Sequence, residues 1–269
     1  MRFALHEVDS RRVRDALARR VLDLPHRAQW LLAQKAEDNR RRLRALRDRH
    51  AGQRCVIMGN GPSLAQMDLA PLASEYTFGL NRIYLLYDKL PFRPTFYACT
   101  NELVLEQFAG EIAALGGVKF VNWNRRQLFG PDPSLCYVRT ALTLADFFGD
   151  DVTRAICAGG TITYVALQIA YHIGFRRVIL VGVDHRFTER GTPNRAEVRT
   201  QERDESHFHP DYFPKGSRWQ LPDLVRSEHA YRLARTAYER AGGQIIDATL
   251  NGQCQVFEKR SLVDALAER

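Results

Sequence analysis

Short runs of apolar residues alternate with longer helical stretches from about residue 54 onward. The runs that we expect to form strands are CVIMG (55–59), YTFGLN (76–81), TFYACTN (95–101), VKFVNW (118–123), RAIC (154–157), RRVILVGVD (176–184) and QIIDAT (244–249). Strands that are apolar throughout are typical of a sheet covered on both faces. Their alternation with helices, such as the one expected over 227–243, predicts parallel βαβ units and an α/β fold.

The first 53 residues follow a different pattern and predict a helical arm. One helical stripe is formed by Val13, Leu17, Val21 and Leu24. We expect Pro25 to interrupt this helix and a second helix to run from about residue 27 to 49. The chain is therefore divided into an arm (1–53) and one α/β domain (54–269).

The net charge of +8 is concentrated in the arm. Residues 1–50 hold 14 Lys and Arg against 7 Asp and Glu, whereas the remainder holds 25 against 24. A basic arm on a nearly neutral body packs on the body or on a second subunit, or contacts an anionic membrane surface. Nucleic acid is not expected as a partner, because the arginine-rich run at 39–50 contains no Phe, Trp or Tyr for base stacking.

The five cysteines are well separated and form no CxxC pair. Their odd number argues against a disulfide framework, so we expect buried thiols in a reducing cytoplasm. The N-terminal residues lack the apolar core of a signal peptide, and no run of 18 apolar residues exists. The expected location is cytoplasmic, with peripheral contact at the inner membrane face as an option.

Residues 186–222 show almost no apolar periodicity and are rich in charged, aromatic and proline residues. A connection of this length inside a compact domain is usually functional or disordered. Because it follows the strand expected at 176–184, it leaves the sheet at the carboxyl end, where open α/β sheets bind ligands. We expect this segment to form a lid over such a site.

The run at 55–58 ends in a Gly-Asn-Gly-Pro-Ser loop. Glycines allow a close approach of backbone, and exposed backbone N–H groups in such a turn bind anions. The loop has neither the lysine of a Walker loop nor the third glycine of GxGxxG. An ordinary tight turn is the alternative. The nucleotide-binding residues that we expect here are Gly59, Asn60, Gly61, Pro62 and Ser63.

An asparagine follows each of the first three expected strands. Besides Asn60, these are Asn81 and Asn101. In a parallel sheet all three amides meet at one edge, and an amide both donates and accepts hydrogen bonds, as a phosphate with sugar hydroxyls requires. Asparagine also favours turns for local reasons.

Two further features point to the same edge of the sheet. Residues 158–161 (AGGT) precede a helix, so Gly159, Gly160 and Thr161 are expected to hold a second anionic group. Asp184 ends the strongest strand, where a carboxylate accepts hydrogen bonds from ribose hydroxyls, binds metal or caps the next segment.

Within the lid, His207 and His209 are candidates for general acid–base catalysis. Their H-x-H spacing is not by itself a zinc site.

The motifs VIMGNGPSL, GLN, YACTN, GGTITYVALQIAYHIGFRRVILVGVD and SHF carry a resemblance to two related families. One is the bacterial CMP-sialic-acid-dependent sialyltransferases. The other includes the central domain of flagellin motility accessory factors and the archaeal 6-hydroxymethylpterin diphosphokinases. The resemblance covers roughly residues 54–258 and implies a Rossmann-like fold with a lid.

The resemblance also implies roles for particular residues. Asn60, Asn81 and Asn101 would contact the CMP donor, the turn at 159–163 would meet its charged end, and a lid histidine would act as base without a metal. The family's tyrosines after the strand aspartate are missing here, and Arg186 is the cation expected to steady the leaving phosphate. The family's base histidine falls later in the lid than His207, in a stretch that holds no histidine in this chain.

The expected function is therefore that of a glycosyltransferase in bacterial surface glycan or glycoprotein synthesis. It would use a nucleotide-activated, CMP-linked acidic sugar and a glycan, lipid-linked or protein acceptor, without a cofactor. One alternative is a Mg²⁺-dependent pyrophosphokinase for a pterin-like alcohol, with Asp184, Asp204 and Glu205 as metal ligands. Another is a non-catalytic nucleotide-binding protein.

Overall fold

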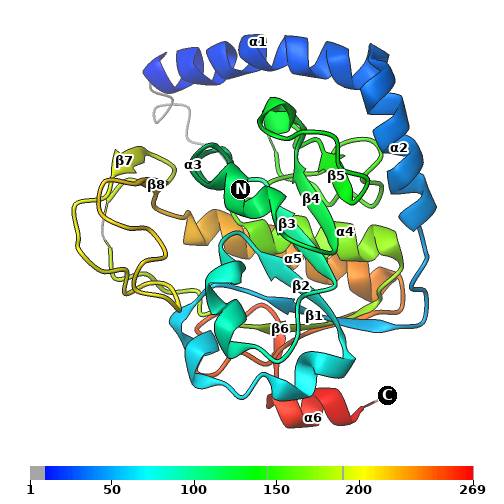
Figure 1. Cartoon of the computed structure of the whole chain (residues 1–269), viewed down its shortest axis with the longest axis vertical. Helices are drawn as coiled ribbons and strands as arrows, with labels where there is room; N and C mark the ends of the chain where they lie inside the picture. Colours follow the sequence, from blue (N-terminus) through cyan, green and yellow to red (C-terminus); the bar gives the residue numbers. More distant parts are fainter. Residues whose placement is uncertain (1–9, 144, 190, 269) are drawn as a thin grey trace.

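The computed structural model describes residues 10–143, 145–189 and 191–268, of which residues 10–19 are described by their backbone alone. Eight strands form one sheet in the order β10-β9-β6-β1-β2-β3-β4-β5, with every neighbouring pair parallel (Figure 1). The strands are β1 (Arg54–Met58), β2 (Tyr76–Leu80), β3 (Phe96–Cys99), β4 (Val118–Asn122), β5 (Leu135–Val138), β6 (Arg177–Val181), β9 (Gln244–Asp247) and β10 (Glu258–Lys259).

Helices flank this sheet, so the predicted Rossmann-like α/β fold is confirmed. The α-helices are α1 (Ser10–Leu32), α2 (Gln34–Leu46), α3 (Glu102–Ala113), α4 (Ile162–Ile173), α5 (Leu224–Arg240) and α6 (Leu262–Ala267). Short 3-10 helices are η2 (Pro62–Gln66), η3 (Ala70–Ser74), η4 (Ile83–Lys89) and η5 (Trp123–Leu128). The largely apolar α4 is buried nearly all round, against β1, β2, β3 and α5.

The strand order reverses at β1, which lies between β6 and β2. Met58 at the end of β1 pairs with Gly79 of β2 on one side and with Val181 of β6 on the other. The three strands therefore end at nearly the same level. In open α/β sheets the loops that leave such a switch point diverge and open a crevice for ligands.

Three details of the predicted strand pattern are wrong, and one of them is that the two-residue edge strand β10 (Glu258–Lys259) was not predicted. The stretch 154–157 forms only one bridge, between Ile156 and Thr140, rather than a strand. The eighth position in the sheet is taken by β5 (Leu135–Val138), which the apolar pattern did not single out. This strand has four residues, as β3 and β9 do, and its buried apolar run LCYV was overlooked in the prediction.

The arm contains the two predicted helices, but the break between them is not at Pro25. Helix α1 continues through Pro25 to Leu32, and the chain turns at Ala33, whose backbone is extended. A proline inside a helix removes one hydrogen bond, and here the helix tolerates that loss. Of the predicted stripe, Val13 and Leu17 lie outside the described side chains.

Helix α2 packs on the body as part of its core. Leu43 and Leu46 are buried, and the amide of Asn39 makes two hydrogen bonds to the backbone of Tyr137 in the edge strand β5, at 2.8 and 2.7 Å. His172 on α4 adds a contact of 2.9 Å to the carbonyl of Leu43. The boundary at residue 53 stays a prediction; α2 nevertheless covers one edge of the sheet.

The segment 186–222, which we call the lid, contains a two-stranded antiparallel ribbon of β7 (Ala196–Val198) and β8 (Arg218–Gln220). Its irregular remainder is organised around buried side chains, which are Arg199, Asp204, Phe208, Tyr212, Phe213 and Trp219. The lid is tied to the body where the Arg82 guanidinium donates to the carbonyls of Asp211 and Tyr212. Gln107 of α3 also exchanges two hydrogen bonds with the backbone of Arg218.

All five cysteines are buried and free, as predicted. Burial raises the pKa of the Cys55 thiol well above its usual range. In the described part of the chain, no helix is both long enough and apolar enough to cross a membrane.

Candidate functional site

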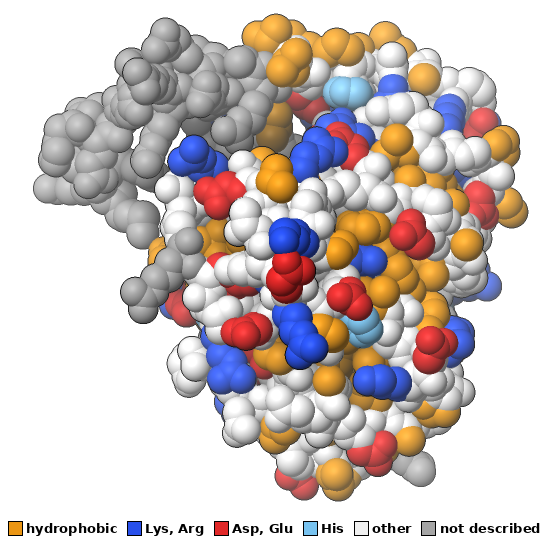
Figure 2. Space-filling model, turned by 60° about the vertical axis from the view of Figure 1, so that its left-hand side comes forward, with side chains coloured by type: hydrophobic (Ala, Val, Ile, Leu, Met, Phe, Trp, Pro, Cys, Tyr) orange, Lys and Arg blue, Asp and Glu red, His pale blue; other side chains and the backbone are white. Residues whose placement is uncertain are grey.

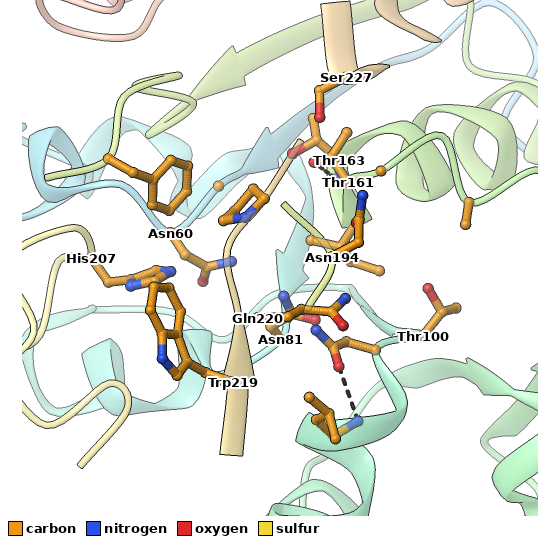
Figure 3. A pocket seen from close by; sticks show the side chains of 18 of the residues that line it. Asn60, Asn81, Thr100, Thr161, Thr163, Asn194, His207, Trp219, Gln220 and Ser227 are labelled. Carbon is orange, nitrogen blue, oxygen red and sulfur yellow. Dashed lines mark hydrogen bonds between the residues drawn. The ribbon is translucent and has the colours of Figure 1, made fainter. Parts of the chain in front are cut away.

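A cavity of about 560 Å³ opens at the carboxyl ends of β1 to β6, beneath the lid (Figure 3). Its walls come from the loops after these strands, from the first turns of α3, α4 and α5, and from the lid. Of the predicted site residues it is lined by Gly59, Asn60, Gly61, Asn81, Asn101, Gly160, Thr161, Asp184, Arg186 and His207. Pro62, Ser63, Gly159 and His209 are not in the lining.

Two asparagines present buried amide oxygens that have no hydrogen-bond partner. These are the Oδ1 atoms of Asn60, after β1, and of Asn81, after β2. Asn81 has a φ of 45°, a left-handed conformation that asparagine tolerates better than most residues. A buried acceptor without a donor costs about 1–3 kcal/mol. Both residues line the cavity, so a turn of either side chain that brings its oxygen toward a hydrogen-bond donor on a ligand would remove this cost.

The other asparagines at this edge are partly used by the protein. Asn101 caps α3, where its Oδ1 accepts from the N–H groups of Leu103 and Val104. Asn122, which also lines the cavity, ends β4 and donates to the carbonyl of Thr100 at 3.1 Å. Asn122 was not among the predicted residues, although the same signal, an asparagine at the end of a strand, marks it.

The loop at 59–63 was predicted to expose its backbone N–H groups to an anion. In the structure, two of these groups are already bonded to carbonyls within the protein. The N–H of Gly59 donates to the carbonyl of Val181, and that of Gly61 donates to the carbonyl of Gly182, both at 2.8 Å. A Cβ on Gly59 would overlap the Gly182 carbonyl. The glycines thus let the loop after β1 lie directly on the loop after β6, and the loop presents the side chain of Asn60 to the cavity.

Asp184 stabilises the contact between the loop after β1 and the loop after β6. Its carboxylate accepts hydrogen bonds from the N–H of Ser63 at 3.1 Å and from the Ser63 hydroxyl at 2.6 Å. A Cβ on Gly61 would overlap the same carboxylate. Burial raises the pKa of Asp184, although the bonds from Ser63 oppose the shift. Ser63 is therefore placed in the scaffold of the site, while Asp184 serves the scaffold and also lines the cavity.

The first turn of α4 reaches the cavity through Gly160, Thr161 and residues 162–163. Thr161 is the N-cap, since its hydroxyl accepts from the N–H of Thr163 at 3.3 Å. Gly159 has a φ of 54° and lies against Tyr164, where a Cβ would collide with the ring. It shapes the turn from outside the lining, and Gly160 and Thr161 face the cavity.

Of the two lid histidines, only His207 lines the cavity. Its Nδ1 lies 2.9 Å from both oxygens of Asp204, whose side chain is fully buried. Its ring is stacked on Tyr212 at 4.0 Å. His209 instead accepts a hydrogen bond at Nδ1 from the N–H of Asp211. The arrangement leaves Nε2 of His207 available to accept a proton, with Asp204 fixing the other nitrogen.

The lid keeps the Asp204 carboxylate ionised. Burial alone would raise the pKa of Asp204, but the hydrogen bond from His207 and the charge of Arg199 outweigh it and lower the pKa. Arg199 is itself buried and makes an ion pair of 3.0 Å with Glu189. The His207 ring is thus held by a buried network of charges.

Three arginines line the cavity and differ in their partners. Arg125 pairs with Glu102 and Glu106, and Arg226 pairs with Asp146. Arg186 has no ion-pair partner among the residues that the structure describes. It follows Asp184 by two residues at the switch point, so it is the cation best placed to meet an anionic group of a ligand.

The lid supplies cavity residues that no sequence pattern marks. These include Phe187, Asn194, Trp219 and Gln220. Figure 3 shows Trp219 and His207 on the same side of the pocket as Asn60. Their positions depend on contacts between segments far apart in the chain, so no local spacing marks them. The surface is rich in amides, hydroxyls and aromatic rings, which suits a polar organic molecule with an anionic group.

The described residues contain no group of three or more His, Cys, Asp or Glu side chains arranged to hold a metal ion. Of the carboxylates predicted for Mg²⁺, only Asp184 lines the cavity. Asp204 faces His207 and Arg199 inside the lid, and Glu205 is exposed.

No protein-family model and no curated protein matches this sequence. A solved structure with a similar fold is that of the MAf glycosyltransferase from Magnetospirillum magneticum AMB-1, with a TM-score of 0.50 and 14% sequence identity. The match covers 86% of this chain but 39% of that one. At this identity the similarity shows a shared fold.

Proposed function

We propose that this chain is a glycosyltransferase that takes its sugar from a nucleotide-activated donor, most simply a CMP-linked acidic sugar. The observation that carries the proposal is the pair of unpartnered, buried amide oxygens on Asn60 and Asn81 at the switch point of the sheet. The fold similarity to a protein named as a glycosyltransferase supports the class of reaction. The choice of CMP follows from the resemblance in the sequence motifs.

The two unpartnered amide oxygens indicate which chemical groups the sugar nucleotide must carry. Phosphate oxygens are acceptors, so a phosphate alone leaves the Oδ1 atoms of Asn60 and Asn81 unsatisfied. Ribose hydroxyls and the exocyclic amine of a base are donors and match them. Asn101, Gly160, Thr161 and Asp184 complete the proposed donor site, with the first turn of α4 facing the charged part of the donor.

His207 is the proposed general base. Its Nε2 would take the proton of an acceptor hydroxyl, whose oxygen attacks the anomeric carbon of the donor sugar. The bond from that carbon to the phosphate oxygen breaks, and CMP leaves with the electron pair. Arg186 would stabilise the charge that develops on the leaving phosphate. Asp204 would hold His207 in the tautomer with the proton on Nδ1.

The pyrophosphokinase alternative has weaker support. It requires carboxylates that converge on Mg²⁺ next to the phosphates of ATP. Of its three predicted ligands, Asp204 is engaged by His207 and Glu205 lies outside the cavity lining.

The test is release of CMP from CMP-N-acetylneuraminic acid in the presence of glycan acceptors. We expect His207→Ala to slow release by about 10²–10⁴-fold and to leave CMP affinity unchanged, because the base acts only in the reaction. His209→Ala is the matched control and should keep both properties. Wild-type rates in His207→Ala would contradict the base assignment. CMP binding without turnover of any CMP-linked sugar would contradict the proposed donor.

A further inference from the structure

Helix α1 packs on the body through one face only. Trp30 is 3% exposed and meets Trp123 of η5 edge to face, with ring centroids 5.2 Å apart. The Trp123 indole N–H donates to the carbonyl of His26 at 3.0 Å. Asp23 is buried and pairs with Arg139 at 2.7 Å. Residues 23, 26 and 30 thus form the inner face.

The outer face of α1 is apolar and has no partner in the described structure. Residues 21, 25, 28 and 32, spaced four, three and four apart, form one stripe opposite the inner face. The side chains of this stripe and of its borders are Val21, Leu22, Leu24, Pro25, Ala28, Leu31 and Leu32. The leucines and the valine among them are 56–85% exposed. Figure 2 shows hydrophobic side chains along the upper rim, where α1 lies in Figure 1.

The charges around this stripe are basic. The one acidic residue in the described side chains of α1, Asp23, is turned inward and neutralised by Arg139. Arg20 and Arg27 have no ion-pair partner among the described residues. On α2, Glu37 and Asp38 are paired with arginines of the same helix. Residues 20–46 together hold seven Lys and Arg against three Asp and Glu.

We infer that the outer face of α1 docks on the surface of an anionic phospholipid bilayer. An apolar face bordered by arginines is the pattern of a helix that lies in the membrane interface, with its apolar residues among the acyl chains and its basic residues at the headgroups. No described helix spans a membrane, so α1 would lie on the surface. A second copy of the chain would bring another basic arm against this one, which charge repulsion opposes.

The docked helix would be coupled to the body. α1 packs on η5, which follows directly from Asn122 at the end of β4, a residue that lines the cavity. The inference does not depend on the reaction that the cavity catalyses.

The test is co-sedimentation of the full chain with vesicles. The chain should pellet with mixed phosphatidylcholine and phosphatidylglycerol vesicles, less so as salt rises, and not with phosphatidylcholine alone. Leu24→Gln combined with Leu32→Gln should weaken this partition by about tenfold or more. The matched control is Val225→Gln combined with Val263→Gln, which changes valines that are 78% and 76% exposed on α5 and α6. All four positions are exposed, so thermal unfolding should be unchanged.

Three outcomes would overturn the inference. The first is that the chain does not pellet with the anionic vesicles. The second is that the Leu24/Leu32 variant pellets as the wild type does. The third, measured by light scattering, is a dimer that the same variant abolishes, because it would identify a second copy as the occupant of the stripe.

Discussion

At the scale of single residues, some polar groups of the site have hydrogen-bond partners within the protein, whereas others have none. Asn60 and Asn81 have unpartnered oxygens, whereas Asp184 is occupied by Ser63 and Asp204 by His207. Ions and amides that are satisfied within the protein hold the geometry, and the unpartnered oxygens of Asn60 and Asn81 belong to residues that line the cavity. The stabilising role of the internally bonded groups can be tested without a ligand at Asp204.

Asp204→Asn should lower the free energy of unfolding by about 3 kcal/mol at neutral pH, because it breaks a buried ion pair. The folded-state pKa of Asp204 is lowered, so its stabilisation is present above the ordinary value of 3.8 and is lost as the pH falls through the folded-state pKa. The difference between variant and wild type should therefore shrink in acid. Urea unfolding at a series of pH values measures it.

The control is Glu202→Gln, which removes an exposed pair with Lys215 and should change stability by less than about 1 kcal/mol. A difference for Asp204→Asn that does not vary with pH would show that its charge does not stabilise the lid.

At the scale of elements, the sheet has an edge that the arm covers. The edge strand β5 presents the N–H and carbonyl of Tyr137, and Asn39 of α2 satisfies both. Gln107 of α3 makes the same kind of paired contact with Arg218 of the lid strand β8. In both places a side-chain amide takes the position that a neighbouring strand would have, which protects an exposed strand edge.

Asn39→Ala should cost about 2–3 kcal/mol, since two buried backbone groups of Tyr137 lose their partners. The Tyr137 amide should also exchange its hydrogen faster than in the wild type. Denaturant unfolding and hydrogen exchange measure the two effects, with Gln34→Ala on the exposed side of α2 as the control. If Asn39→Ala were as stable as Gln34→Ala, the arm would not secure the sheet edge.

The sequence predicted the elements whose signal is local. Strands such as β1 and β6 are continuously apolar, and α4 carries a helical pattern over its whole length. The prediction overlooked the apolar run of β5, and it was wrong at Pro25, where α1 continues and Trp30, beyond the proline, packs on Trp123. At Pro25 the tertiary contact accompanies a helix that local propensity does not predict.

At the scale of the whole molecule, the candidate site was predicted in part. Asparagines after successive strands were sufficient to locate the crevice, because parallel strands end at one edge of the sheet. The role of the 59–63 loop was not predictable, since it depends on contact with the loop after β6. The lid is likewise placed by contacts such as that of Arg82 with Asp211, which are 129 residues apart.

The central claim is that this cavity binds CMP through Asn60 and does so without a metal. The most direct measurement is calorimetric titration of the chain with CMP, CTP, GDP and UDP without added metal, and with ATP with and without Mg²⁺. We predict that CMP binds without metal, that Asn60→Ala weakens binding by about 10- to 100-fold, and that Gln255→Ala on the surface leaves it unchanged. Binding of ATP only with Mg²⁺, equal affinity in Asn60→Ala, or no binding of any nucleotide would contradict the claim.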